Sequence, residues 1–268
     1  MSRGERSPRI VPGSVDAHFH TLVMEEKGLP ATGILRECFE AGMAYGLDIA
    51  VSLEDFEQRL TRLESLDRVY LTAGLHPSNA GRVSFETCEA TLRASLSSPR
   101  VVALGEIGLD WFRDHGTRQE QRDLFASQIE LANELRLPII VHNRDATAAI
   151  LDVFAAHPPT AESVMHCFSA DAEAAGHFLD LGFSLSFGGN VTYRQSEDIR
   201  RAAARTPDDR ILLETDAPFL SPQKVRGTPN HPGFVGYTYE FLADVRGQRV
   251  EELAAAARAN FERIFLGR

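Results

Sequence analysis

The chain has 268 residues, 43% of them apolar and 25% charged, so it can bury a full hydrophobic core and is neither disordered nor fibrous. Its net charge of −10 argues against a basic face that grips long duplex DNA, because phosphate neutralisation supplies much of that affinity. No apolar run is long enough to cross a bilayer, and the polar start lacks the apolar stretch of a secretory signal. We therefore expect a cytoplasmic protein with a flexible N-terminal extension over residues 1–12.

The three cysteines indicate neither a disulfide framework nor a thiolate zinc site. Cys38, Cys88 and Cys167 are odd in number and scattered, and no CxxC pair occurs. This usage is typical of a reducing compartment. The side chain of Cys167 is expected to face outward toward a helix, so we do not expect a reactive thiol there.

Eight short segments rich in Val, Ile, Leu and Phe have the pattern of parallel strands that are covered on both faces. In chain order these predicted strands are Val15–His18, Leu47–Leu53, Val69–Gly74, Val101–Glu106, Pro138–His142, Ser163–Cys167, Phe183–Phe187 and Ile211–Thr215. Segments with helical periodicity lie between them. The predicted helices are Thr32–Gly46, Thr117–Leu135, Asp145–Ala156, Asp171–Leu181, Ser196–Arg205 and Val250–Phe265. Thr117 and Glu120 have the spacing of a capping box.

The repetition of a strand and a helix along the whole chain predicts a parallel sheet with right-handed crossovers. Eight such units favour a closed (β/α)8 TIM barrel, which typically needs about 250 residues, over an open sheet. We expect a single domain over residues 1–268, because no linker interrupts the pattern. The Pro- and Gly-rich stretch Ser221–Gly236 is interpreted as a long loop after the last strand, at the face where TIM-barrel active sites lie.

Six side chains that can bind metals stand at the carboxyl ends of predicted strands. They are His18, His20, Glu106, His142, His166 and Asp216. A single histidine at a strand end is more often structural than a ligand. Six such positions on the one face that carries TIM-barrel active sites favour a paired metal site instead.

The spacing suggests how these side chains are divided between two cations. His18 and His20 are two residues apart on an extended strand, so their side chains project to the same side. Asp216 ends the last strand, which lies beside the first in a closed barrel. His142 and His166 end neighbouring strands and can hold a second cation. The glutamate of the fourth strand can bridge both cations, because a carboxylate has two oxygens.

Successive motifs along the chain resemble those of a known family. They are Asp16-Ala17-His18-Phe19-His20, Gly74-Leu75-His76-Pro77, Gly105-Glu106-Ile107-Gly108-Leu109-Asp110, Val141-His142-Asn143-Arg144-Asp145-Ala146, His166-Cys167-Phe168-Ser169, Glu214-Thr215-Asp216-Ala217-Pro218, and Arg226-Gly227 followed by Asn230 and Pro232. From about Val15 to Phe265 the chain resembles the TatD-type metal-dependent hydrolases of the amidohydrolase superfamily.

The resemblance implies a metal-binding DNase that hydrolyses phosphodiester bonds, as a 3′–5′ exonuclease on single strands, with divalent cations such as Mg²⁺, Mn²⁺ or Zn²⁺. It assigns the first-strand histidines and Asp216 to one cation, His142 and His166 to the other, and Glu106 to both. We expect two cations to activate a water, and Asp216 to accept its proton. Asp16 is expected to orient the histidines.

Further side chains are candidates for contact with the substrate. They are Arg144, Arg226, Asn230 and Trp111 for binding, and His76 for donation to the phosphate or the leaving group. The guanidinium of Arg144 suits a phosphate, although an ion pair with Asp145 or Glu173 is the alternative. Arg226 and Asn230 could contact backbone phosphates from the last loop.

Other polar and aromatic positions have two interpretations each. Trp111 and Phe112 could stack on a base or simply cover the barrel mouth. His76 could equally well cap the turn that follows it. Glu214 is expected to be a structural partner of the aspartate in the first motif or of a histidine. Asn260 is expected to tether the last helix to the barrel bottom or a nearby loop.

The residues alone leave two other functions possible. Related barrels hydrolyse amides, esters or lactones on similar metal sites, and deacylation of D-aminoacyl esters is one such activity. A glutamate at position 106, where other barrels use a lysine that becomes carboxylated, favours phosphate esters together with Arg144 and Arg226. A non-catalytic scaffold is the third possibility, but every expected ligand is present, which favours an enzyme.

Overall fold

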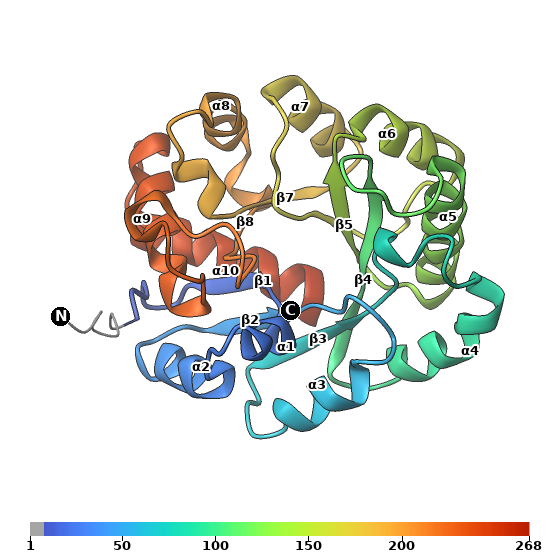
Figure 1. The fold of residues 1–268 in the computed structure, drawn as a ribbon. Helices are drawn as coiled ribbons and strands as arrows, with labels where there is room; N and C mark the ends of the chain where they lie inside the picture. Colours follow the sequence, from blue (N-terminus) through green and yellow to red (C-terminus); the bar gives the residue numbers. More distant parts are fainter. Residues whose placement is uncertain (1–7, 268) are drawn as a thin grey trace.

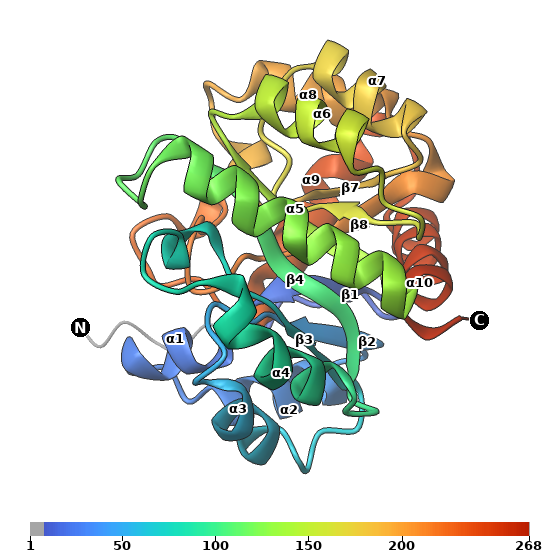
Figure 2. The same ribbon diagram turned by 90° about the vertical axis from the view of Figure 1, so that its right-hand side faces the viewer.

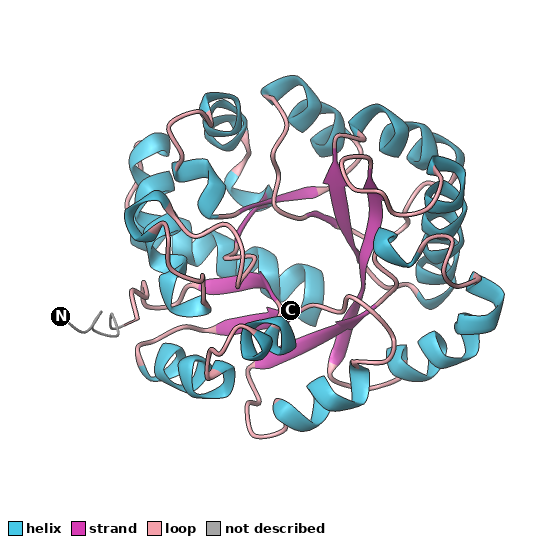
Figure 3. Cartoon of the chain, viewed as in Figure 1, coloured by secondary structure: helices cyan, strands magenta, loops and turns pink. Residues whose placement is uncertain are grey.

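Eight parallel strands form one barrel in a computed structural model that describes residues 8–267. The strands pair in chain order from the first to the eighth. They are β1 (Val15–Phe19), β2 (Tyr45–Asp48), β3 (Val69–Ala73), β4 (Val101–Asp110), β5 (Ile139–Arg144), β6 (Val164–Met165), β7 (Ser184–Phe187) and β8 (Ile211–Leu213). Figure 1 looks along the barrel, and Figure 3 shows from the same side that helices surround the strands. The predicted TIM barrel is confirmed.

The described residues form helices as well as strands, and most of the helices cover the outside of the barrel, whereas α1 (Thr21–Glu26) lies at its mouth (Figure 1). The other helices are α2 (Ala31–Glu40), α3 (Phe56–Arg62), α4 (Phe85–Leu96), α5 (Arg118–Leu135), α6 (Thr147–Ala156), α7 (Ala172–Asp180), α8 (Glu197–Arg205), α9 (Val235–Arg246) and α10 (Val250–Leu266). Short 3-10 helices are η1 (Pro77–Asn79), η2 (Gly189–Thr192), η3 (Asp208–Arg210), η4 (Gln223–Val225) and η5 (Pro232–Phe234). Figure 2 shows α4 and α5 in front of β3 and β4. Within residues 8–267, no helix is long and apolar enough to span a membrane.

The ring closes through the segment that follows β8. Phe19 forms a parallel bridge with Ala217, and His20 N donates to Ala217 O at 2.8 Å. Asp216 N donates to His18 O at 2.9 Å. Backbone hydrogen bonds of the ligand-bearing segments themselves therefore hold the two ends of the sheet together.

One predicted helix and one predicted strand have different bounds in the structure. The predicted helix Thr32–Gly46 ends at Glu40, and its last two residues already belong to β2. Gly42 has a φ of +105°, which an L side chain rarely adopts, so the chain turns there and begins the strand earlier than predicted. The predicted strand Leu47–Leu53 correspondingly ends at Asp48.

Four helices were absent from the sequence prediction, namely α1, α3, α4 and α9. The first two are 6 and 7 residues long, too short for apolar periodicity to show. The helix α9 begins at Val235, inside the predicted loop Ser221–Gly236, and η4 and η5 occupy much of the rest. The long loop is therefore shorter and more ordered than its composition suggested.

Strand β4 continues beyond its predicted end at Glu106 to Asp110. Its pairing with β5 shifts between Leu104 and Ile107, so Glu106 lies at an irregularity within the strand. A Cβ atom on Gly108, which has a φ of +136°, would lie 2.1 Å from the carbonyl oxygen of β5 residue His142. Glycine thus allows the two strands to approach closely beside the candidate ligands.

One contact in each of the two longest helices matches its prediction. Thr117 and Glu120 form the capping box at the start of α5. The Asn260 amide donates to Asp208 O at 2.8 Å and to Ile211 O at 2.9 Å, at the start of β8. Asn260 therefore ties α10 to the amino-terminal end of the barrel.

Only part of the expected flexible N-terminal extension can be described, because residues 1–7 lie outside the described residues. From residue 8 the chain is bound to the barrel: Arg9 N donates to Gly233 O at 2.6 Å, and Gly236 N donates to Arg9 O at 2.9 Å. Val11 is buried. Residues 8–12 are thus held against η5 and the start of α9, contrary to the expected flexibility.

His231, beside this segment, makes a testable contribution to stability. Burial against the Phe234 ring, 3.8 Å away between centroids, lowers its pKa from 6.5 to about 4. Between pH 6.5 and pH 4 a proton therefore binds mainly to the unfolded chain, and stability falls as the pH falls through this window. We expect His231→Gln to remove about 2–3 kcal/mol of this pH dependence, measured by urea unfolding at pH 7 and pH 4. The exposed His177→Gln is the control, and an equal effect there would contradict the assignment.

Candidate metal centre

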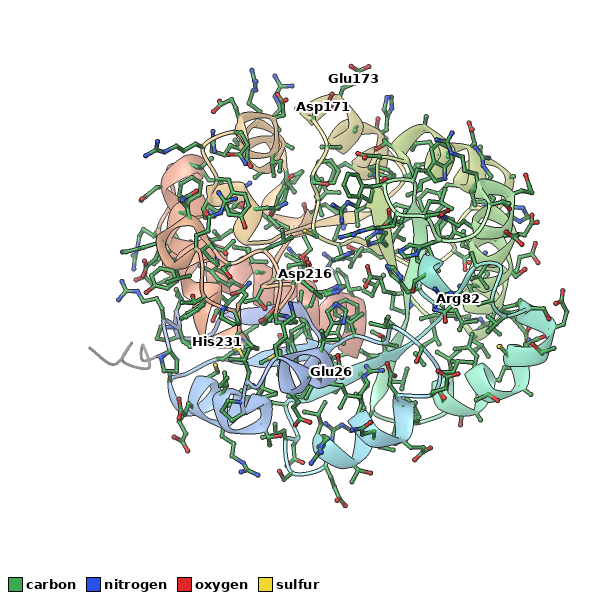
Figure 4. The ribbon with its side chains drawn as sticks, viewed as in Figure 1. Glu26, Arg82, Asp171, Glu173, Asp216 and His231 are labelled. Carbon is green, nitrogen blue, oxygen red and sulfur yellow. The ribbon has the colours of Figure 1, made fainter. Side chains whose placement is uncertain are left out.

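Two histidines and an aspartate meet where the ends of β1 and β8 lie together. His18 lies in β1 and His20 directly follows it, with their Nε2 atoms 3.2 Å apart. Asp216 Oδ1 lies 3.5 Å from His20 Nε2 and 3.8 Å from His18 Nε2. Both imidazoles are buried, and the three groups can offer ligand atoms to one ion. Figure 4 shows Asp216 near the middle of the ring of helices.

The backbone of Asp216 directs its carboxylate into this cluster. Its φ is +56°, in the left-handed region that aspartate and asparagine adopt more readily than most residues. The N–H of Asp216 donates to His18 O at 2.9 Å, so the turn is anchored on β1. This turn lies beyond β8, which ends at Leu213, so the strand pattern alone does not define it.

One carboxylate lies between this cluster and a second pair of histidines. Glu106 Oε2 lies 3.5 Å from His18 Nε2 and 4.0 Å from His20 Nε2. The other oxygen, Oε1, lies 2.7 Å from His142 Nδ1 and 2.8 Å from His166 Nε2. Each carboxylate oxygen faces a different imidazole pair, which is the arrangement of a group that can bridge two cations.

The electrostatics of the cluster favour cation binding. Burial alone would raise the pKa of Glu106, but His166, His142 and His18 hold it well below its usual value. Burial alone would lower the pKa of His166, but Glu106 and Glu214 raise it well above its usual value. Without metal, protons on imidazoles therefore supply the positive charge, and metal binding should release them.

The donor set also fits divalent cations. Four imidazoles and the carboxylates beside them are ligands that suit zinc or manganese, whereas oxygen ligands suit magnesium. Two ligand-type atoms, His18 Nδ1 and Glu214 Oε2, are buried with no hydrogen-bond partner within the described chain. Buried polar atoms are usually paired, so these two atoms fit a centre that binds a group the protein itself does not supply.

Residues behind the cluster hold it in place. Glu214 Oε1 lies 3.1 Å from His166 Nδ1, so the predicted partnership of this glutamate with a histidine is present. Asp16 accepts from Thr215 N at 2.9 Å, from Thr215 Oγ1 at 2.7 Å and from His18 N at 3.3 Å. Asp16 therefore orients His18 through a hydrogen bond to the backbone of that residue. Burial raises the pKa of Asp16 to about 8.

The sequence prediction did not single out Asp110 as a functional residue. Its Oδ2 lies 3.3 Å from His142 Nε2, while Oδ1 accepts from Phe112 N at 3.0 Å and Arg113 N at 2.9 Å. A signal was available, because Asp110 lies four residues beyond Glu106 and side chains at such spacing face the same side of an extended strand. Asp110 thus orients one imidazole and begins the loop after β4.

Both interpretations of His76 agree with its surroundings. Nδ1 accepts from Ser78 N at 3.1 Å, so His76 caps the turn that follows β3. The proton assigned from this bond lies on Nε2, which is 3.9 Å from Glu106 Oε1 and faces the metal cluster. Burial lowers the pKa of His76 to about 3, so the ring is neutral and offers one N–H to the site.

Two cavities open beside the cluster at the barrel mouth. The larger, of about 430 Å³, is lined by His20, His76 and Phe219 among others, and the smaller, of about 250 Å³, by Asn143 and Asn190 among others. The side chains that line both are His142, Arg144, His166, Asp216 and Leu220. Three of the candidate ligands, His142, His166 and Asp216, therefore line both cavities.

Arg144 is free to bind a ligand in this mouth. Among the described residues no ion pair joins Arg144 to Asp145 or Glu173, and Figure 4 shows Glu173 at the outer edge of the molecule. The guanidinium lies over the Phe112 ring, 4.1 Å from its centroid. The predicted alternative of an ion pair is absent, so the charge of Arg144 is available to an anion.

Cys167 lines the smaller cavity and does not face outward as predicted. The prediction assumed that the extended strand continues past His166, but β6 ends at Met165 and Cys167 has a φ of +44°. This left-handed turn brings the thiol toward the site. Burial raises the pKa of the Cys167 thiol well above its usual value, in agreement with the expectation that it is not reactive.

Comparison with known proteins identifies the family. The family model described as TatD related DNase matches residues 15–266. The chain belongs to the TatD family. It is 36% identical to the metal-dependent hydrolase YcfH of Escherichia coli K12, over 94% of this chain and 95% of that protein.

Two further relatives extend this comparison. Over 72% of this chain and 76% of the relative, it is 38% identical to a protein of Erwinia billingiae named 3′-5′ ssDNA/RNA exonuclease TatD. The crystal structure of YjjV, a TatD homologue of Escherichia coli, is 30% identical with a TM-score of 0.84, over 95% of this chain and 98% of that one. This TatD-family protein is a metal-dependent hydrolase with clusters of candidate metal ligands.

Three residues of the TatD-family chain that were predicted to contact the substrate differ from one another in burial and in neighbours. Asn230 is fully buried, and its amide donates to Thr215 O at 2.8 Å and Phe219 O at 2.6 Å, so in this structure it holds the loop that contains Asp216. Arg226 is exposed and lies over the Tyr193 ring, 4.7 Å from its centroid. Trp111 is partly buried beneath Arg118, 4.1 Å from its ring centroid.

A buried ion pair supports His20. Arg59 Nε donates to Asp48 Oδ2 at 2.6 Å, and both side chains are almost completely buried. The other oxygen of Asp48 accepts from Thr21 N at 2.7 Å, directly after His20. His20 Nδ1 lies 3.2 Å from Ile49 O, directly after Asp48. The ion pair thus fixes both backbone segments that orient this imidazole.

We expect Arg59→Leu to lower the free energy of unfolding by about 3–5 kcal/mol, because it leaves the Asp48 carboxylate buried without its partner. Urea unfolding of the metal-free protein measures this. Arg62→Leu on the same helix is the matched control, because Arg62 pairs with Glu25 while half exposed and should contribute less than about 1 kcal/mol. Equal losses in the two variants would contradict the role of Arg59.

Proposed function

We propose that this TatD-family hydrolase cleaves phosphodiester bonds in single-stranded DNA with two divalent cations. The observation that carries the proposal is the position of Glu106, whose two oxygens face two different imidazole pairs. The unpaired guanidinium of Arg144 beside the centre suits a phosphate. The name of the Erwinia billingiae relative supports a nucleic-acid substrate and the 3′–5′ direction.

The side chains have distinct roles in this reaction. When bound, divalent cations would lower the pKa of a water and offset the charge on phosphate oxygens. Asp216 lines both cavities and is the group that accepts the proton of the attacking water. The Nε2–H of His76 faces the larger cavity and donates to the phosphate or to the leaving oxygen. Arg144 holds the phosphate between the two cavities.

The test uses protein stripped of metal and a 5′-labelled single-stranded DNA oligomer. Mg²⁺, Mn²⁺ and Zn²⁺ are added separately, and an excess of chelator is the control. We expect a ladder of shortening products that depends on metal and that gives the direction of cleavage. An intact oligomer under every metal, from protein shown by elemental analysis to hold ions, would refute the nuclease and lead to amide, ester and lactone substrates.

A further inference from the structure

Two exposed phenylalanines lie at the barrel mouth. The large hydrophobic side chains exposed within residues 8–267 are Phe112 (58%), Phe219 (42%), Leu135 and Leu181. The two leucines lie at the carboxyl ends of α5 and α7, at the opposite face of the barrel. The two phenylalanines follow β4 and β8, on the same face as the metal cluster. Exposed aromatic rings are therefore found on the face of the barrel that carries the metal cluster.

Each of these rings carries a cation that has no carboxylate partner. The Arg144 guanidinium lies 4.1 Å from the centroid of Phe112, and Lys27 Nζ lies 4.8 Å from that of Phe219. Neither cation forms an ion pair with a residue of the described chain, whereas Arg93, far from the mouth, pairs with both Glu89 and Glu134. In a protein with a net charge of −10, unpaired cations at the mouth favour an anionic ligand.

The two rings lie on opposite sides of the metal cluster. In an eight-stranded ring, β4 and β8 are four strands apart, so the loops that follow them face each other across the mouth. Phe219 lines the larger cavity and lies 6.1 Å from the His20 ring. On the other side, Arg113 and Arg144 line the same cavity, and both guanidinium groups lie over Phe112. A chain that crosses from one ring to the other passes over the candidate ligands.

We propose that Phe112 and Phe219 are stacking platforms for the two bases that flank the scissile phosphate of a single strand. This inference rests on the proposed nuclease function and specifies its substrate. Unpaired bases offer free π-faces to such rings, whereas the bases of a duplex are stacked on one another. Arg144 and Lys27 lie where they can neutralise the phosphates next to the stacked bases. Charged side chains, among them Arg113, Arg144 and Asp216, line the cavity beside Phe219, so the mouth is not a continuous apolar patch for a protein partner.

The test combines protein variants with abasic oligomers. The substrates are a single-stranded DNA oligomer and two copies in which the nucleotide on one side or the other of the scissile phosphate lacks its base. The variants Phe112→Leu and Phe219→Leu keep an apolar side chain but remove the ring, and Leu135→Ala is the control on the opposite face. We expect each phenylalanine variant to raise KM for the intact oligomer about fivefold to tenfold, since base stacking on aromatic side chains contributes effects of that order or larger.

The decisive result is coupling between one ring and one base. Loss of the base that stacks on Phe112 should raise KM in the wild-type protein but cause no further rise in Phe112→Leu, and the other base should behave likewise with Phe219→Leu. Independent, multiplicative effects at both positions, or KM values within twofold of the wild type and of Leu135→Ala, would overturn the stacking proposal while the nuclease stands.

A failure of the nuclease proposal gives a different pattern. The wild-type protein would then leave every oligomer intact, and stacking is tested by the fluorescence anisotropy of a labelled oligomer with the metal-loaded protein. Binding that weakens in both phenylalanine variants, but not in Leu135→Ala, would still support the stacking platforms. Binding that is absent, or equal in all variants, would overturn them.

Discussion

Replacement of Glu106 by glutamine is expected to abolish measurable hydrolysis and to release the metal ions. The two carboxylate oxygens face separate imidazole pairs, and an amide has only one oxygen to offer. Loss of an outer partner of a metal ligand typically costs about 10- to 100-fold in affinity or activity, so loss of a shared ligand should exceed that range. Elemental analysis of the purified variant and the rate of oligomer cleavage measure the two effects.

Glu173→Gln provides the matched control for this change. Glu173 is exposed, and Figure 4 places it at the outer edge of the molecule. Its replacement makes the same chemical change without touching the cluster, so metal content and rate should match the wild type. Retention of two ions with normal activity in Glu106→Gln would contradict the bridging role.

Asp216→Asn is expected to lower kcat by about 10²- to 10⁴-fold, the usual contribution of a positioned general base. Asparagine tolerates the φ of +56° at this position about as well as aspartate, so the turn should be kept while the proton acceptor is lost. Single-turnover rates, measured together with metal content, separate loss of the base from loss of a ligand. A normal rate in this variant would show that another group accepts the proton.

Asp216→Ala separates the backbone effect from the chemical one. Alanine cannot bond locally in the left-handed region, and we expect an additional loss of about 1–2 kcal/mol in the free energy of unfolding relative to Asp216→Asn. Urea unfolding of the metal-free variants tests this. Equal free energies of unfolding in the two variants would mean that neighbouring residues hold this turn whichever residue occupies position 216.

The fold was predictable because parallel strands covered on both faces leave a strong local signal. Segments such as Val101–Glu106 and Ile211–Thr215 are short, apolar and regularly spaced, and eight of them allow few topologies. Short helices such as α1 and α3 left no comparable signal. Their few residues cannot display a helical period, and their formation depends on packing against the barrel.

The set of candidate ligands was predictable for a related reason. The carboxyl ends of parallel strands meet at one face, so histidines and carboxylates at those ends must converge whatever the details of the loops. Asn230 shows the limit of this reasoning. As a polar residue in a loop near the site it resembles a substrate contact, but its burial and its hydrogen bonds to Thr215 and Phe219 depend on where the loop folds back.

The sequence by itself determined the barrel, and it predicted six candidate ligands at one face of it, because these follow from local periodicity and from the ends of strands. Only the tertiary structure decided which oxygen of Glu106 faces which imidazoles, that Asp110 adjoins His142, and that Cys167 turns toward the cavity. These features depend on backbone angles and on contacts between distant segments. The pattern of residues along one segment predicts neither the backbone angles nor the contacts with distant segments.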